Sequence, residues 1–218
     1  MKMNFFKKVL CIPKSLYFNL YYFSFRRAIK LPVLVAHDVK LLNMGNRDGV
    51  KINDSAGKIH IGFGESFALG GRTGWDLSDG GKVVFKGPAT FGRGTQIICR
   101  GSITFGENFY CNANCVINAG KSIKFGENVL LGWNCTVLDG DGHKLIDKNG
   151  ESFKYDSVDI GNHVWCAFES KILKGSFVPD NSVVAAGACI TKKFDKHALL
   201  LGGFNRVLRT EIEWNRTF

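Results

Sequence analysis

The amino-acid sequence predicts an all-β solenoid, a stack of coils with a triangular cross-section. Two observations lead to this fold class. Apolar residues recur at a fixed spacing between Val83 and Phe194, and small residues recur four positions after them. Fixed spacings of this kind are typical of repeat architectures, in which each coil contacts only its neighbours and several coils together hide a core.

The apolar repeat returns every 20 residues over 85–137 and every six residues over 160–190. A step of six matches neither the period of an amphipathic helix nor the alternation of an ordinary strand. It fits one short strand and one inward side chain on each side of a triangle, with two extra residues per coil where the step is 20. The predicted inward residues are Phe85, Phe91, Ile97, Phe105, Cys111, Ile117, Phe125, Leu131, Val137, Ile160, Cys166, Ile172, Val178, Val184 and Ile190.

Small residues mark the predicted corners, where the chain turns from one side of the triangle to the next. They are Ala89, Thr95, Gly101, Cys115, Cys135, Ser170, Ser176, Ser182 and Ala188. An ordinary sandwich of short strands would instead show irregular spacing and hairpin dipeptides, and the sequence has little of either.

We expect three segments in the chain of 218 residues. A basic, aromatic cap occupies 1–57, the solenoid occupies 58–195 with a long loop at 138–159, and a C-terminal segment with a short helix occupies 196–218. The seven cysteines fall mostly on the repeat, which indicates reduced thiols used as small apolar residues. No Cys/His pattern indicates a metal site. The opening residues lack the apolar core of a signal peptide, so we expect a cytoplasmic protein.

The net charge of +10 is concentrated at the N-terminus, where residues 1–40 hold eight Lys or Arg against Asp38 alone. Many aromatic residues accompany these charges. One interpretation is a cap over the open first coil, which every solenoid needs. The other is peripheral contact with anionic lipids at the inner face of the cytoplasmic membrane. The two interpretations are compatible. Nucleic acid is not an expected partner because the basic cluster carries no recognisable motif.

His143 lies in the long loop, two residues after Asp141 and four after Asp139. Histidine ordinarily titrates near neutral pH and serves as a general base, and a nearby carboxylate can orient its ring. The residues alone equally allow a solvated loop histidine beside two turn-forming aspartates.

Four motifs resemble the hexapeptide-repeat acyltransferases: IGNHVW (160–165), ILKG (172–175), DNSVVAAGACITK (180–192) and RVLR (206–209). Within that family the sequence is most similar to sugar and exopolysaccharide O-acetyltransferases of the galactoside and maltose type, over roughly residues 58–214. The resemblance implies a left-handed parallel β-helix, a homotrimer, and transfer of an acetyl group from acetyl-CoA to a sugar hydroxyl. It also implies that His143 is the general base, with Asp141 or Asp139 beside it.

The resemblance implies a donor site between adjacent coils of neighbouring subunits. The matching positions are Trp165, Ala167, Phe168, Ala186, Thr191, Lys192, Arg206 and Arg209. Asn112 matches an asparagine that faces the acceptor sugar in the family. The sequence departs from the family where WIG becomes 165–167 Trp-Cys-Ala and GAG becomes 185–187 Ala-Ala-Gly, and Phe168 adds bulk beside the expected thioester. The alternatives are an amine or serine acceptor, or a trimeric scaffold that has lost its chemistry.

Overall fold

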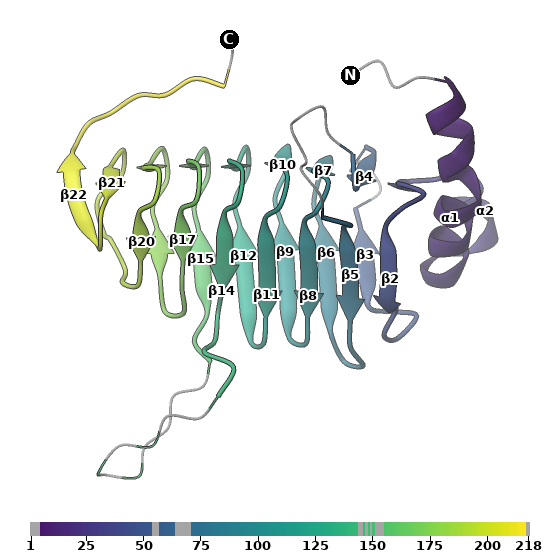
Figure 1. The fold of residues 1–218 in the computed structure, drawn as a ribbon, viewed down its shortest axis with the longest axis horizontal. Coiled ribbons are helices and arrows are strands. Elements are labelled where there is room, and N and C mark those ends of the chain that lie inside the picture. The colour runs from purple at the N-terminus through teal and green to yellow at the C-terminus, as the bar shows by residue number, and fades with distance from the viewer. Residues whose placement is uncertain are drawn as a thin grey trace.

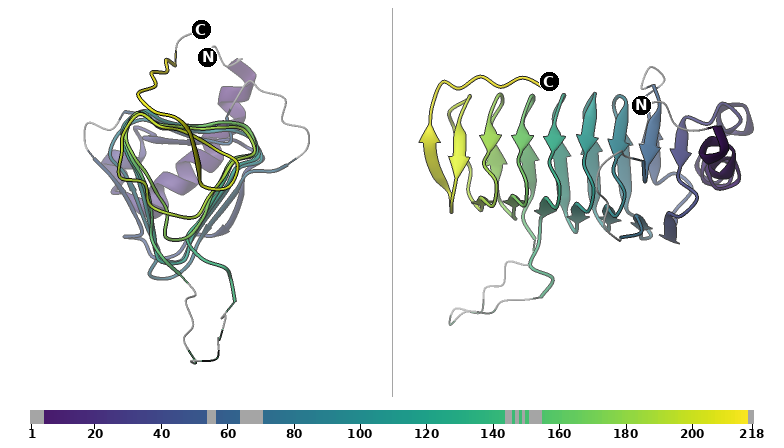
Figure 2. Two further views of the ribbon diagram at one scale, coloured as in Figure 1. Left: turned by 90° about the vertical axis from the view of Figure 1, so that its left-hand side faces the viewer. Right: turned by 45° about the horizontal axis from the view of Figure 1, so that its top comes forward.

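The computed structural model describes residues 5–53, 57–63, 71–143, 146, 148, 150 and 155–216. The chain forms a left-handed parallel β-helix, which confirms the predicted fold class (Figure 1). Viewed end-on, the coils outline a triangle (Figure 2). Among the described residues, no helix combines the length and hydropathy that crossing a membrane would require.

Each side of the triangle is one sheet, and every pairing within the sheets is parallel except the last, between β21 and β22. Sheet A contains β1 (Val33–Val35), β4 (Ile59–Ile61), β7 (Ala89–Phe91), β10 (Phe109–Cys111), β13 (Leu130–Leu131), β16 (Trp165–Cys166), β19 (Val183–Val184), β21 (Leu200–Gly202) and β22 (Arg206–Arg209). Sheet B contains β2 (Lys40–Asn43), β5 (Gly74–Leu77), β8 (Gln96–Cys99), β11 (Val116–Ala119), β14 (Thr136–Leu138), β17 (Lys171–Ile172) and β20 (Cys189–Ile190). Sheet C contains β3 (Val50–Ile52), β6 (Lys82–Phe85), β9 (Ser102–Phe105), β12 (Ser122–Phe125), β15 (Val158–Ile160) and β18 (Phe177–Val178).

The predicted inward residues form the core, and all 15 are buried. Equivalent residues lie directly over one another in the parallel register. Phe105 stacks on Phe85 with ring centres 5.2 Å apart and on Phe125 with ring centres 5.3 Å apart. The predicted corner residues Thr95, Cys115 and Ser182 are also buried, because they point into the narrow angle between two sides, which leaves no room for a larger side chain. All seven cysteines are free thiols.

Asparagine residues at two corners adopt left-handed backbone conformations. Asn108 and Asn128 do so at the corner between sheets C and A, and Asn114 and Asn134 at the corner between sheets A and B. Their side chains tolerate positive φ better than those of most residues, and they recur once per coil. Asn108 Nδ2 also donates to Asn128 Oδ1 at 3.1 Å, so equivalent corners bond to one another along the axis.

The N-terminal segment caps the first coil with α1 (Phe5–Tyr22) and α2 (Phe25–Ala28), as the sequence predicts. Polar residues on the inner face of α1 bond the free edge of β1. Ser15 Oγ accepts from Val35 N at 2.8 Å, and Asn19 Nδ2 donates to Val33 O at 2.7 Å. Below them Phe18 packs edge-on against Trp75, with ring centres 5.2 Å apart. The parallel sheets begin at Val33, ahead of residue 58, where we expected the solenoid to start.

The predicted C-terminal helix is wrong. Residues 206–209 form β22, which pairs antiparallel with β21 after a turn through Gly203 and Asn205, both of which have positive φ. The physical reason is that the last coil leaves a free strand edge. A returning strand satisfies that edge with its own backbone, whereas a helix could do so only through side chains. Beyond β22 the chain runs back along the outside of the coils as an extended segment (Figure 1). We call residues 210–216 the C-terminal strap.

Candidate functional site

A groove of about 620 Å³ lies on the outer face of sheet A. Its floor consists of outward side chains on successive strands: Tyr110 on β10, Leu130 on β13 and Trp165 on β16, which are aligned in register. Inward and outward side chains alternate along a strand, so the same coils that bury Cys111, Leu131 and Cys166 present these residues to solvent.

The groove brings together five of the residues predicted from the sequence. Trp165, Ala167, Phe168 and Ala186, expected at the donor site, line it together with Asn112, expected at the acceptor site. The rest of the lining was not predicted from the sequence: Tyr110, Leu130, Gly132, Trp133 and the strap residues Trp214, Asn215 and Arg216. Trp133 carried a signal that could have found it, since it is a large aromatic residue at a corner otherwise made of small ones.

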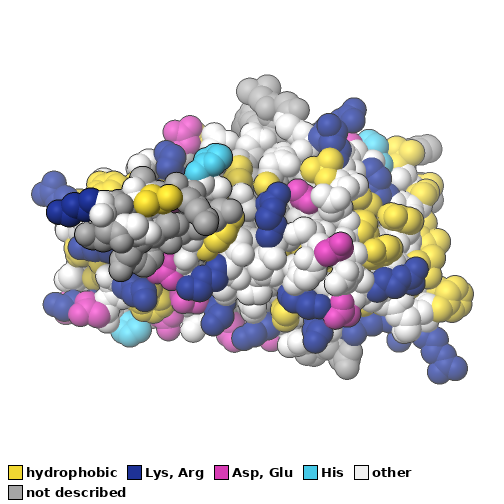
Figure 3. All heavy atoms as spheres, turned by 90° about the horizontal axis from the view of Figure 1, so that it is seen from below, with side chains coloured by type: hydrophobic (Ala, Val, Ile, Leu, Met, Phe, Trp, Pro, Cys, Tyr) yellow, Lys and Arg dark blue, Asp and Glu magenta, His cyan; other side chains and the backbone are white. Residues whose placement is uncertain are grey.

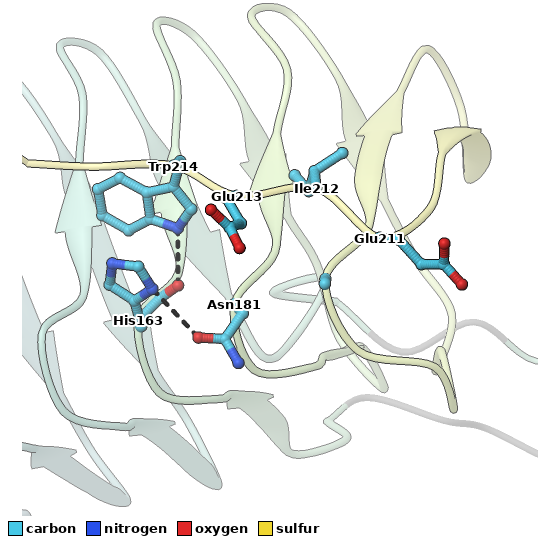
Figure 4. Close-up of a pocket in the computed structure, with 7 residues that line it drawn as sticks. His163, Asn181, Glu211, Ile212, Glu213 and Trp214 are labelled. Atoms are coloured by element: carbon cyan, nitrogen blue, oxygen red, sulfur yellow. Dashed lines mark hydrogen bonds between the residues drawn. The ribbon is translucent and has the colours of Figure 1, made fainter.

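The C-terminal strap forms one wall of the groove. The indole of Trp214 stacks on the imidazole of His163, with ring centres 4.2 Å apart, and its Nε1 donates to His163 O at 2.9 Å (Figure 4). Arg216 Nη1 donates to Asn108 O at 2.9 Å, and Ile212 N donates to Ala198 O at 3.0 Å. These contacts fasten the strap along the corner between sheets C and A.

A second cavity, of about 530 Å³, lies along the strap, and its lining includes His163, Asn181, Glu211 and Glu213. His163 Nδ1 and Asn181 Oδ1 are 3.1 Å apart, which fixes the imidazole under Trp214 (Figure 4). Glu213 extends from the strap toward the coil, whereas Glu211 points away from it (Figure 4). His163 therefore supports the strap, and its ring is engaged on one face and at one nitrogen.

The remaining predicted donor residues do not line the groove. Thr191 is tied to the β21–β22 turn, because its backbone N donates to Asn205 Oδ1 at 2.7 Å and its hydroxyl accepts from Asn205 Nδ2 at 2.6 Å. Lys192 is exposed, with its Nζ 5.0 Å from the centre of the Phe194 ring. Arg206 and Arg209 are exposed on β22. These cationic side chains lie at the C-terminal end of the solenoid, beyond Ala186.

The two predicted aspartates have different surroundings. Asp139 is fully buried, and its carboxylate accepts from the backbone N of Gly120, Lys121 and Ser122 at 2.6, 2.7 and 2.6 Å. It thereby holds the corner where the long loop leaves β14. Asp141 is exposed and pairs with Lys174. Among the described residues, no hydrogen bond joins His143 to either aspartate, and His143 is exposed.

The groove and the loop that carries His143 lie on different sides of the chain. The loop connects β14 in sheet B to β15 in sheet C, so it leaves the coil at the corner opposite sheet A. Viewed end-on, its residues 139–143 leave the bottom corner of the triangle, whereas the strap lies at the top (Figure 2). One copy of the chain therefore does not bring His143 to its own groove.

The sequence of the chain is similar to that of a sugar O-acetyltransferase. A galactoside O-acetyltransferase of Escherichia coli (strain K12) is 32% identical to the chain over 111 residues, which are 50% of the chain and 54% of that protein. The resemblance to sugar O-acetyltransferases is confirmed. The chain spans about half the length of this curated relative. No protein-family model matches the chain.

The fold of the chain is also found in a solved structure. An N-acyltransferase from Bacillus cereus, in complex with dTDP and coenzyme A, matches 87% of the chain with 90% of its own length, at 14% identity and a TM-score of 0.51. A hexapeptide-repeat acetyltransferase from Vibrio cholerae, in complex with acetyl coenzyme A, matches 50% of the chain with 60% of its own length, at 25% identity and a TM-score of 0.43.

Proposed function

We propose that this chain is an acetyl-CoA-dependent O-acetyltransferase whose acceptor is a hydroxyl of a sugar, carried on a polysaccharide, a lipid-linked glycan or a nucleotide sugar. The observation that supports this most strongly is the groove on sheet A. It gathers Trp165, Ala167, Phe168 and Ala186 with Asn112, residues that the resemblance assigns to the donor and the acceptor.

The donor would lie along the groove, parallel to the axis of the solenoid. Apolar and small side chains there suit a narrow pantetheine chain, and Ala167 and Ala186 let it approach the backbone. Lys192, Arg206 and Arg209 would hold the phosphates, since they are exposed cations at the C-terminal end of the same solenoid. The reacting thioester would then face the opposite end, nearer Asn112.

His143 would act as the general base. The acceptor oxygen attacks the carbonyl carbon of the thioester while the imidazole takes the hydroxyl proton. The C–S bond then breaks, the thiolate of coenzyme A takes that proton, and the products are an acetyl ester and free coenzyme A. The step needs no covalent enzyme intermediate, and much of the rate would come from holding both substrates in place. The imidazole would be oriented by Asp141, because the oxygens of Asp139 are engaged by the corner.

A homotrimer would complete the site. The loop that carries His143 projects from the corner opposite the groove, which is the geometry expected if each loop serves the groove of a neighbouring copy (Figure 2). Cyclic assemblies of this kind repeat one heterologous contact around an axis until the ring closes.

Peripheral contact with an anionic membrane is a further part of the proposal, through the N-terminal cap. The polar residues of α1 face inward to bond β1, so its described outer face is apolar. That face consists of Val9, Leu10, Ile12, Pro13, Leu16, Tyr17 and Leu20. Arg26 and Lys30 are exposed beside it, and residues 1–37 contain no Asp or Glu. Hydrophobic and basic side chains gather at this end of the molecule (Figure 3). Such a face would rest at the boundary between headgroups and acyl chains.

Co-sedimentation with vesicles tests the membrane contact. We expect binding to vesicles that contain phosphatidylglycerol, weaker binding to phosphatidylcholine alone, and a decrease with added salt. The double variant Leu10→Glu/Leu20→Glu should abolish binding, whereas Val207→Glu at the opposite end should not. Equal binding by both variants would contradict the contact.

Release of free thiol from acetyl-CoA, measured with a panel of sugars and nucleotide sugars, tests the proposed activity. We expect turnover that requires a sugar and falls at least about 100-fold in His143→Ala, the range of general-base contributions. Lys124→Gln, which alters an exposed cation on sheet C, is the matched control. Turnover with amines alone would favour the amine acceptor. If acetyl-CoA is neither bound nor turned over, the trimeric scaffold without chemistry is favoured.

A further inference from the structure

Arg216, in the C-terminal strap, brings a guanidinium to one end of the groove. Its Cζ lies 5.1 Å from the centre of the Tyr110 ring, and its Nη1 donates to Asn108 O. Burial against the coil lowers the pKa of the guanidinium, although the residue as a whole is exposed. An incoming ligand can therefore reach a cation that is already partly desolvated.

No counter-charge accompanies this cation within the part of the chain that the structure describes. The ion pairs among the described residues join Lys82 to Asp48, Arg93 to Asp38, Arg100 to Asp76, Lys121 to Asp156 and Lys174 to Asp141. Arg216 is in none of them. Of the described residues that line the groove, it is the one that carries a charge. A partly desolvated guanidinium that pairs with none of the described carboxylates favours an anionic ligand, which would supply charge-assisted hydrogen bonds.

The rest of the lining fits a ring-shaped polar ligand. Aromatic side chains surround the groove: Tyr110, Trp133, Trp165, Phe168 and Trp214. The apolar C–H face of a sugar ring packs well on such surfaces, and aromatic side chains supply a large contact area. Asn112 and Asn215 add amide groups that can bond hydroxyls.

The place of Arg216 along the axis separates the acceptor from the donor. Arg216 lies over Tyr110 on β10, the strand that precedes Asn112. Ala186 follows β19, three strands further along sheet A, or about 14 Å at the usual strand spacing. Arg206 and Arg209 on β22 lie five strands away, about 24 Å. Arg216 thus lies at one end of the groove, and the cations proposed for the donor phosphates lie beyond its other end.

We infer that Arg216 recognises a carboxylate on the acceptor, so that the acceptor is an acidic sugar and not a neutral one. The inference rests on the proposed function, because it takes the groove to be the site where a sugar meets the acyl donor. A phosphate of coenzyme A would offer similar anionic chemistry. Arg216 lies over Tyr110, on the strand that precedes Asn112, and both Arg216 and Asn112 line the groove, which favours the acceptor.

Direct binding tests the inference without requiring turnover. Saturation-transfer NMR and calorimetry would compare methyl β-glucuronide, methyl β-glucoside and coenzyme A on the full chain. We expect the glucuronide to bind at least about tenfold more tightly than the glucoside, as a charge-assisted pair allows. Arg216→Gln should remove this preference and leave coenzyme A binding within about twofold, and Lys124→Gln should change neither.

Equal affinity for the two glycosides would overturn the inference. So would an Arg216→Gln variant that weakens coenzyme A and spares the glucuronide, because the guanidinium would then serve a donor phosphate. Glucuronide binding that depends on Arg216, in a chain that never releases thiol from acetyl-CoA, would support the acidic-sugar site while contradicting the proposed transferase. The two failures are therefore distinguishable.

Discussion

The two ends of the solenoid are capped in different ways. At the N-terminal end, α1 lies across the open coil, and the buried side chains of Ser15 and Asn19 satisfy the backbone of β1. At the C-terminal end, β22 pairs with β21 through backbone hydrogen bonds, and its four residues are exposed. One end is closed by side chains that reach into the core, the other by a strand on the surface.

Because of this difference, we expect the N-terminal end to contribute mainly to stability and the C-terminal end mainly to the groove. The N-terminal cap buries Phe18 against Trp75, so losing it would expose the core. The C-terminal chain continues past β22 as the strap and contributes Trp214 and Arg216 to the groove. Because the strap covers surface and not core, it can be altered without opening the coils.

The largest expected effect is at the N-terminal end. Asn19→Ala removes the buried partner of Val33 N and Val33 O, and we expect it to lower the free energy of unfolding by about 3 kcal/mol, because buried backbone groups are left unsatisfied. Asn205→Gly, which breaks the half-buried contact with Thr191 and keeps the positive φ of this residue unstrained, should cost about 1 kcal/mol. Urea denaturation measures both. Equal losses would contradict the contrast between the ends.

Trp214 tests the strap. We expect Trp214→Ala to change the free energy of unfolding by less than about 1 kcal/mol, since the strap can detach without exposing the core. The same variant should weaken ligand binding in the groove about tenfold, and Trp214→Phe should recover part of that loss by restoring a ring over His163. A large loss of stability with unchanged binding would assign the strap to the scaffold.

Thiol alkylation compares the two ends in one experiment. Cys189, half-buried near the C-terminal turn, should react first with iodoacetamide in the native protein. Cys11, buried under the cap, should react when the cap opens, and Cys111, Cys115 and Cys166 only on global unfolding. Burial raises the pKa of Cys11, which slows it further. Mass spectrometry of digests gives the order, and Cys11 reacting before Cys189 would show that the cap is the weaker end.

The smallest expected effect is that of alkaline pH on the free energy of unfolding. It concerns Cys99, in the coils between the two ends. Burial raises the pKa of Cys99 to about 11 from an ordinary value of 9.0. Between these values the unfolded chain loses a proton that the folded chain keeps, so stability is full below about pH 9 and falls as pH rises. Cys99→Ala should reduce the loss between pH 9 and pH 10 by about 1 kcal/mol in urea denaturation. An unchanged slope would contradict this origin.

Most of the coil was predictable from the repeat, because a fixed spacing of apolar residues in the sequence corresponds to one coil geometry. Phe85, Phe105 and Phe125 are 20 residues apart in the chain and stack in the core. The groove was predictable in part for the same reason, since Trp165, Ala167 and Ala186 belong to the coils and the repeat determines which way they face. Arg206 and Arg209 were expected on a helix but lie on β22. The prediction was wrong because the local sequence does not show that the last coil leaves a free strand edge.

The sequence by itself determined the coil, its inward residues and its small corners, because burial selects apolar side chains at every sixth position and tight turns select small ones. Only the tertiary structure decided how the ends are finished and where the strap lies. Trp214 meets His163 across 51 residues, and Arg216 meets Asn108 across 108 residues. Contacts that distant leave no periodic trace in the chain. They depend on where the chain leaves the last coil and on which surface of the solenoid it then packs against.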